Sequence, residues 1–106
     1  MRVIEKKMIQ AVASKGKMSL QNTKVETTSG ITKVYLHGNQ IAEIDWAGKL
    51  MFLSNCGWKT TTTKSRLNAV LRELKPGTSI YQKKGEWYVH TPESTEEFDK
   101  SQVFSF

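Results

Sequence analysis

The chain has 106 residues, of which 38% are hydrophobic and 25% charged, so it has the size of one domain and enough apolar material to exclude wholesale disorder. Its one cysteine, Cys56, excludes an internal disulfide and a multi-cysteine zinc site, and no apolar run approaches the roughly 18 residues that cross a bilayer. The formal net charge of +6 favours an anionic partner, and the charged first residues lack the apolar stretch of a secretion signal.

The first predicted element is an amphipathic helix from Val3 to Ala13. Apolar residues recur there at helical spacing between charged ones, and Ser14 to Lys17 supply a glycine and cations suited to a helix end. The residues of the apolar stripe are Ile4, Met8, Ala11 and Val12. We expect a short connection from there to about Asn22.

A meander of three to four antiparallel strands is predicted next, because short segments rich in β-branched and aromatic residues alternate with turn residues. The expected strands are Lys24 to Thr28, Ile31 to His37, Gln40 to Asp45 and Leu50 to Ser54. The expected reversals are Ser29-Gly30, Gly38-Asn39 and Ala47-Gly48.

A second helix is predicted to end before Pro76-Gly77, with Thr62 or Thr63 as its N-cap. Its core stripe has the spacing i, i+3, i+4, i+7 and consists of Leu67, Val70, Leu71 and Leu74. A C-terminal β-hairpin follows, with strands from Ser79 to Lys83 and from Glu86 to His90.

These elements predict an α+β fold in which residues 1–91 form a single globular domain. Residues 92–106 are expected to be an acidic, aromatic-ended tail that is weakly ordered unless its apolar residues dock. Those apolar residues are Phe98, Val103, Phe104 and Phe106. The tail has four acids and one base, which leaves the body with 15 bases and 6 acids.

Several motifs resemble a family of small, mostly uncharacterised proteins encoded by tailed bacteriophages. These motifs are Asn22-Thr23-x-Val25, Val34 to Ala42, Gly57-Trp58-Lys59-Thr60 followed by Thr62 to Asn68, and Gln82 to Val89. The resemblance spans nearly the whole chain and implies an accessory protein that acts in the host cytoplasm during host takeover. It implies no activity and no site residues.

The strongest candidate site is the start of the second helix. Backbone amides, threonine and serine hydroxyls, Lys64 and Arg66 could converge there on a phosphate, although threonines also serve as ordinary caps and the cations as solvated side chains. No glycine-rich run precedes Lys64, so this is not a Walker loop.

Aromatic residues interspersed with lysines form a second candidate site, since bases stack on exposed rings while lysines meet phosphates. Most of these rings must be core in a chain this small, and Trp58 is expected to be among the buried ones. Tyr35 and Trp87 are the candidates for base contact, and Trp87 and Tyr88 must face opposite sides of their strand.

Catalytic and metal sites are not expected. His37 and His90 belong to no close ligand cluster, and Cys56 fits a half-buried structural thiol better than a nucleophile. Glu43 and Asp45 share one strand face, which is a weak signal for acid chemistry or a hard cation. We therefore expect no enzyme and no cofactor.

The favoured hypothesis is a non-enzymatic protein that binds nucleic acid without strong sequence specificity. The candidate contacts are Lys59, Thr62, Thr63, Lys64, Arg66, Arg72, Tyr35 and Trp87. One alternative is an inhibitor or modulator of a host protein or defence complex. Another is a sponge for a nucleotide signal bound by residues Thr60 to Arg66. The acidic tail could also cover the basic surface and compete with a polyanion.

Overall fold

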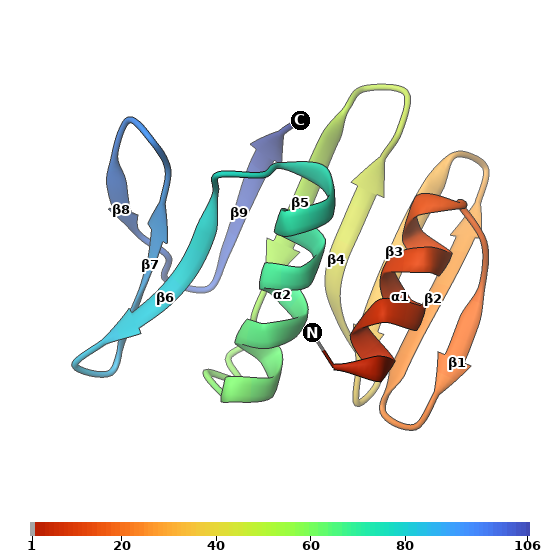
Figure 1. Cartoon of the computed structure of the whole chain (residues 1–106), viewed down its shortest axis with the longest axis horizontal. Coiled ribbons are helices and arrows are strands. Elements are labelled where there is room, and N and C mark those ends of the chain that lie inside the picture. Colours follow the sequence, from red (N-terminus) through yellow and green to blue (C-terminus); the bar gives the residue numbers. More distant parts are fainter. Residues whose placement is uncertain (1) are drawn as a thin grey trace.

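The computed structural model describes residues 2–106, which form two helices and two antiparallel sheets (Figure 1). The α+β class is confirmed, but the two sheets contain more strands than the sequence predicted. The elements in chain order are α1 (Val3–Ala13), β1 (Met18–Leu20), β2 (Thr23–Thr28), β3 (Ile31–Leu36), β4 (Asn39–Asp45), β5 (Leu50–Ser54), α2 (Thr61–Leu74), β6 (Ser79–Lys83), β7 (Glu86–His90), β8 (Thr95–Glu97) and β9 (Ser101–Ser105).

The larger sheet has six strands in the order β1-β2-β3-β4-β5-β9. The predicted meander supplies four of them, while Met18–Leu20, expected to be a connection, forms the additional strand β1. The turn between β3 and β4 has positive φ at His37 and Gly38, one residue earlier than predicted. Both helices lie on one face of this sheet (Figure 1).

Burial alternates along the strands, as expected for a sheet with helices on one face. In β3, Thr32, Val34 and Leu36 are buried, whereas the residues between them are half-exposed. A register shift beside Val34 inserts an extra residue in β4, so that Ile41 and Ala42 are both buried in sequence. Among residues 2–106, no helix packs on the other face of the sheet (Figure 1).

The two helices are held by the predicted apolar stripes. In α1, Met8 and Val12 are fully buried, and the helix ends where predicted, although Lys15 rather than the glycine takes the left-handed conformation, with φ 55°. In α2, Leu67 and Leu71 are fully buried. Because α2 packs between the two sheets, its buried surface is wider than one stripe.

The smaller sheet has the order β6-β7-β8 and contains the predicted hairpin β6–β7. Trp87 points into the core, where its ring stacks on Phe98 with a centroid separation of 6.1 Å. Tyr81 and Tyr88 stack on the outer face with centroids 5.5 Å apart. Trp87 and Tyr88 therefore face opposite sides, as predicted.

Residues 92–106 contribute a strand to each sheet. β8 pairs with β7, and β9 pairs with β5. Phe98 and Phe104 are buried, and Phe106 packs edge-on against Trp46 with centroids 5.9 Å apart, while Val103 stays exposed. Docking of these phenylalanines orders the segment. In the described residues, no helix has the length and apolar character needed to cross a membrane.

Candidate functional site

A cavity of about 420 Å³ opens at the start of α2, and we call it the Trp58 cavity. Alternate turns of an antiparallel meander lie at the same end of the sheet, which brings the β3–β4 turn beside the β5–α2 loop. The lining residues come from these two segments, from the end of β3, from β4 and from the first turn of α2: Leu36, His37, Asn39, Ile41, Asn55, Trp58, Thr60, Thr62 and Thr63.

The β5–α2 loop holds Trp58 at the cavity through a tight turn. Cys56 and Gly57 have φ values of 54° and 83°, and the Trp58 amide donates to the Asn55 carbonyl at 2.8 Å. Two consecutive positive φ values with this hydrogen bond are typical of a type I′ turn. Glycine suits the second position because it has no Cβ.

Buried Asn55 anchors this turn to the rest of the protein. Its side-chain oxygen accepts from the Gly57 amide at 2.8 Å, and its backbone amide donates to the Lys100 carbonyl at 2.9 Å. The Cys56 thiol donates to the Gln40 carbonyl at 3.1 Å, and the side chain is half-buried, as expected. Trp58 is thus presented on an anchored loop.

The expectation that Trp58 is a core residue is wrong, since 60% of its surface is exposed. The tight turn directs its indole outward, and Trp87 and Phe98 fill the aromatic positions in the core. An exposed indole beside a cavity is the most distinctive feature of this surface. The Asn-Cys-Gly turn directly before Trp58 is a sequence signal that could have indicated it.

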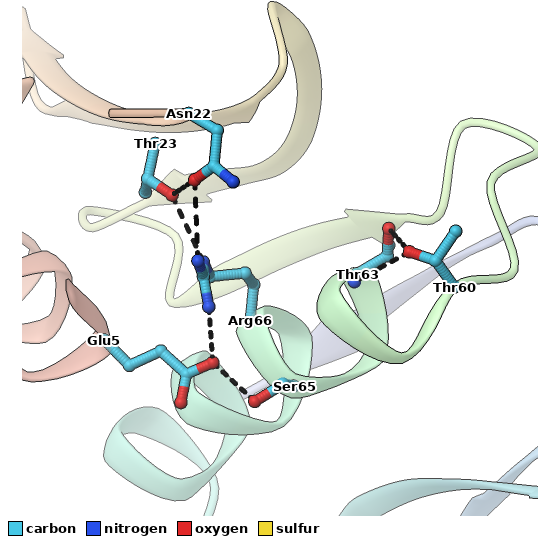
Figure 2. Close-up of polar contacts among 7 residues, drawn as sticks. All are labelled: Glu5, Asn22, Thr23, Thr60, Thr63, Ser65 and Arg66. Carbon is cyan, nitrogen blue, oxygen red and sulfur yellow. Dashed lines mark hydrogen bonds and ion pairs between the residues drawn. The ribbon is translucent and has the colours of Figure 1, made fainter. Parts of the chain in front are cut away.

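The first turn of α2 has a different cap from the predicted one. Thr60 is the N-cap, and its hydroxyl oxygen accepts from the Thr63 amide at 3.1 Å (Figure 2). The Thr63 side chain is buried and its hydroxyl lies 2.9 Å from that of Thr60, so it is engaged within the cap. Thr62 is half-buried and lines the cavity. The backbone amides of Thr61 and Thr62 precede the first intrahelical hydrogen bond, so they can donate hydrogen bonds to an anion.

Arg66 is not available to a phosphate, contrary to the sequence prediction. It is 3% exposed, and its Nη1 donates to Glu5 at 2.7 Å while its Nε donates to the Thr23 hydroxyl at 3.1 Å (Figure 2). Its Nη2 contacts the Asn22 side-chain oxygen at 3.5 Å. Arg66 therefore joins α2 to α1 and to the start of β2.

Glu5 is the acidic partner buried with Arg66. Burial raises the pKa of the Glu5 carboxyl, but hydrogen bonds from Ser65 and Arg66, together with the positive charges of Arg66 and Arg2, lower it by more. The pKa of Glu5 therefore lies below its ordinary value. The carboxylate stays charged at neutral pH and neutralises Arg66.

The remaining predicted cations are not all at one place. Lys59 follows Trp58 and pairs with Glu86 at 3.9 Å, which brings the start of β7 beside this loop. Lys64 is half-buried in the first turns of α2. Arg72 is exposed near the other end of the helix, about 15 Å from Thr62 at about 1.5 Å per residue, so it does not join the cavity.

The two predicted stacking rings also lie away from the cavity. Tyr35 is half-buried on the helix-free face of the larger sheet, where its hydroxyl donates to Glu26 at 3.2 Å and the Lys24 ammonium lies 5.6 Å from its ring centroid. Trp87 has no exposed surface. Its assignment as a base contact is wrong because the alternation of β7 turns it inward, toward Phe98.

The structure brings no catalytic set together at the cavity. His37 lies on its rim, whereas the His90 imidazole lies 3.1 Å from the Thr95 hydroxyl in the smaller sheet. Within residues 2–106, no group of three or more histidines, cysteines and acids is arranged to hold a metal ion. Of the predicted site residues, only Lys59, Thr62, Thr63 and Lys64 belong to this region.

The architecture defines a small two-sheet α+β protein with an aromatic-edged cavity at a helix start. The chain belongs to the Kyanoviridae Gp96 protein family, whose model matches residues 1–105. This is a family of cyanophage proteins, so the phage origin implied by the resemblance is confirmed. The curated proteins and the solved structures contain no significant match to the chain.

Proposed function

We propose that this phage protein is a non-enzymatic accessory protein that binds nucleic acid, without strong sequence specificity, at the Trp58 cavity. The observation that carries the proposal is the exposed Trp58 indole, held by an anchored turn at the mouth of the cavity. Every base has a π-face, so stacking on an indole tolerates any sequence.

Cations beside the indole support a polyanionic ligand. Lys59 follows Trp58 directly, and its ion pair with Glu86 brings the β6–β7 turn, which carries Lys84, to the same region. Lys83 pairs in register with Glu86 and adds another charge. These lysines can neutralise phosphates on either side of a base stacked on Trp58.

The start of α2 supplies uncharged donors for a phosphate. The amides of Thr61 and Thr62 lie at the positive end of the helix dipole, and the Thr62 side chain lines the cavity. In this arrangement the base contacts Trp58 and the phosphate contacts the helix start. Single-stranded nucleic acid fits it better than a duplex because its bases are free to stack.

The test is a titration of fluorescently labelled single-stranded and duplex oligonucleotides at low salt. We expect Trp58→Ala to weaken single-strand binding by about 5- to 150-fold, since stacking contributes about 1 to 3 kcal/mol per base. The matched control is Tyr81→Ala, which removes an exposed ring from the outer face of the smaller sheet. Equal affinity in the two variants, or no binding by the parent protein at low salt, would refute the proposal.

The volume of the cavity favours a second candidate, a sponge for a nucleotide signal. About 420 Å³ lies within the usual range of small-molecule pockets, roughly 300 to 1,000 Å³. A mononucleotide or cyclic dinucleotide would then raise the thermal midpoint, while a homopolymer would not. The host-protein alternative predicts instead a partner that is retained in a pull-down after nuclease treatment.

A further inference from the structure

The two sheets formed by the described residues have four edges, and three of these are protected against pairing with another strand. β6 is sealed by Asn68 of α2, whose side chain accepts from the Ile80 amide at 2.7 Å and donates to the Ile80 carbonyl at 2.8 Å. β8 is short and carries Glu96 and Glu97, and β1 is also short. Short strands and charges are common protections of sheet edges.

Of the sheet edges in residues 2–106, β9 is the least protected. It lies at the end of the larger sheet, beside the C-terminal end of the chain (Figure 1). The strand Ser101–Ser105 contains no charge, no proline and no break in its register with β5. An edge of this kind is a template for strand pairing.

The hydrogen-bond pattern shows which backbone groups of β9 point outward. Phe106 donates to the Lys49 carbonyl at 3.0 Å, and Asn55 donates to the Lys100 carbonyl at 2.9 Å. Because antiparallel bonding alternates along a strand, Phe104 and Gln102 face β5, and Ser101, Val103 and Ser105 face away from it. The Lys75 ammonium donates to the Ser105 carbonyl at 2.8 Å, which agrees with this direction.

An apolar patch continues up to this edge on the helix-free face of the sheet. Val103 is 59% exposed and pairs in register with Phe52, which is 37% exposed. Leu50 lies two residues before Phe52 and is 44% exposed. Side chains two residues apart on a strand share a face, so these three form one patch.

We propose that two copies of this chain pair through β9, in antiparallel orientation about a two-fold axis at Val103. In this register Val103 meets Val103 of the second copy, and Ser101 meets the second copy's Ser105. Each pair exchanges backbone N–H and C=O hydrogen bonds, with the second lone pair of the Ser105 carbonyl left for Lys75. The two sheets become one continuous sheet.

The sequence of β9 favours a second copy over another extended chain. Ser101 and Ser105 are placed symmetrically about Val103, so the strand face that carries these three side chains is complementary to itself when reversed. Pairing also brings the two apolar patches side by side across the axis and creates no opposed like charges within the strands. The inference is independent of the nucleic-acid proposal, because β9 contributes no residue to the Trp58 cavity.

The first test measures molar mass by light scattering and sedimentation over a range of concentrations. We expect a dimer for the parent chain and at least about tenfold weaker association for Val103→Lys, because two lysines would oppose each other at the axis. Ser19→Lys is the matched control, since it adds the same charge to the edge strand β1. A parent chain that is monomeric up to millimolar concentration would overturn the proposal, as would unchanged association of Val103→Lys.

The second test reports the register directly and does not depend on the affinity of Val103→Lys. In a Cys56→Ser background, Val103→Cys is expected to form a disulfide between copies, because hydrogen-bonded antiparallel partners have Cα atoms about 5.5 Å apart, within the range of a disulfide. Ser101→Cys, which faces Ser105 of the second copy, is expected to crosslink far less. Equal crosslinking of the two variants, or none in either, would contradict the proposed axis.

Discussion

The acidic partner of Arg66 lies 61 residues away in the sequence. The five residues of α2 that precede it are threonines, a lysine and a serine, so the sequence favours a solvated, phosphate-binding role. The fold instead brings Glu5 of α1 to within 2.7 Å and buries both side chains. A contact between residues so far apart leaves no local signal, which explains why Arg66 could not be recognised as structural.

We expect Arg66→Met to lower the free energy of unfolding by about 3 to 5 kcal/mol, because it leaves the Glu5 carboxylate buried without its counter-ion. The double variant Glu5→Met/Arg66→Met is expected to recover most of this loss, since neither charge then remains buried. Urea denaturation of the parent, Glu5→Met, Arg66→Met and the double variant gives a double-mutant cycle. Additive losses would show that the two charges do not act as a pair.

The pKa of Glu5 determines the pH at which its contribution to stability is lost. Because the folded pKa lies below the unfolded value, this contribution is fully present above the unfolded pKa and is lost as pH falls through the folded pKa. We expect Glu5→Gln to be less stable than the parent at pH 7, and we expect this difference in stability to narrow below about pH 4. Urea midpoints of both proteins from pH 7 to pH 3 measure the difference. In Glu73→Gln, an exposed control, no comparable narrowing is expected.

At the scale of single elements, the local patterns were sufficient for both helices, the meander and the hairpin. The N-cap was misplaced because four consecutive threonines offer equivalent hydroxyls, and only the path of the preceding loop selects Thr60. Trp87 was placed on the correct strand, but alternation alone does not say which face of a hairpin meets the core. In the structure the face that carries Trp87 is the one that packs against Phe98.

The contact between Asn68 and β6 can be tested at the scale of one element. The Asn68 side chain makes the two backbone hydrogen bonds to Ile80 that a neighbouring strand would otherwise make. Asn68→Ala is expected to cost about 1 to 3 kcal/mol of unfolding free energy, since the Ile80 amide and carbonyl lose their partners. Amide hydrogen exchange at Ile80 should accelerate. Asn68→Asp keeps an acceptor for the amide and should fall between the parent and Asn68→Ala, whereas Gln82→Ala is the exposed control. Unchanged exchange in Asn68→Ala would show that this contact does not protect β6.

At the scale of the whole molecule, residues 92–106 tie the two sheets together. They form β8 and β9, bury Phe98, and support the Trp58 loop through the hydrogen bond from Asn55 to Lys100. Deletion of this segment is therefore expected to abolish cooperative unfolding, as measured by circular dichroism during heating. Retention of a sharp transition would show that the body folds without it.

The hypothesis that the acidic tail competes with a polyanion must be tested with a variant in which residues 92–106 stay folded. Glu93→Gln/Glu96→Gln/Glu97→Gln removes three exposed charges from the segment without removing a buried side chain. If these charges compete with a polyanion, the variant should bind labelled oligonucleotides more tightly, with a gain that shrinks as salt screens the charges. Unchanged affinity at low salt would remove the hypothesis.

The sequence by itself determined the α+β class, the two amphipathic helices and the consecutive antiparallel pairings, because periodicity and turn chemistry act between near neighbours. The tertiary structure decided which residues meet across long separations: Arg66 with Glu5, β9 with β5, and Trp58 with the helix start rather than with the core. Such contacts depend on how whole elements pack, and packing is fixed by the total apolar surface that the elements bury together.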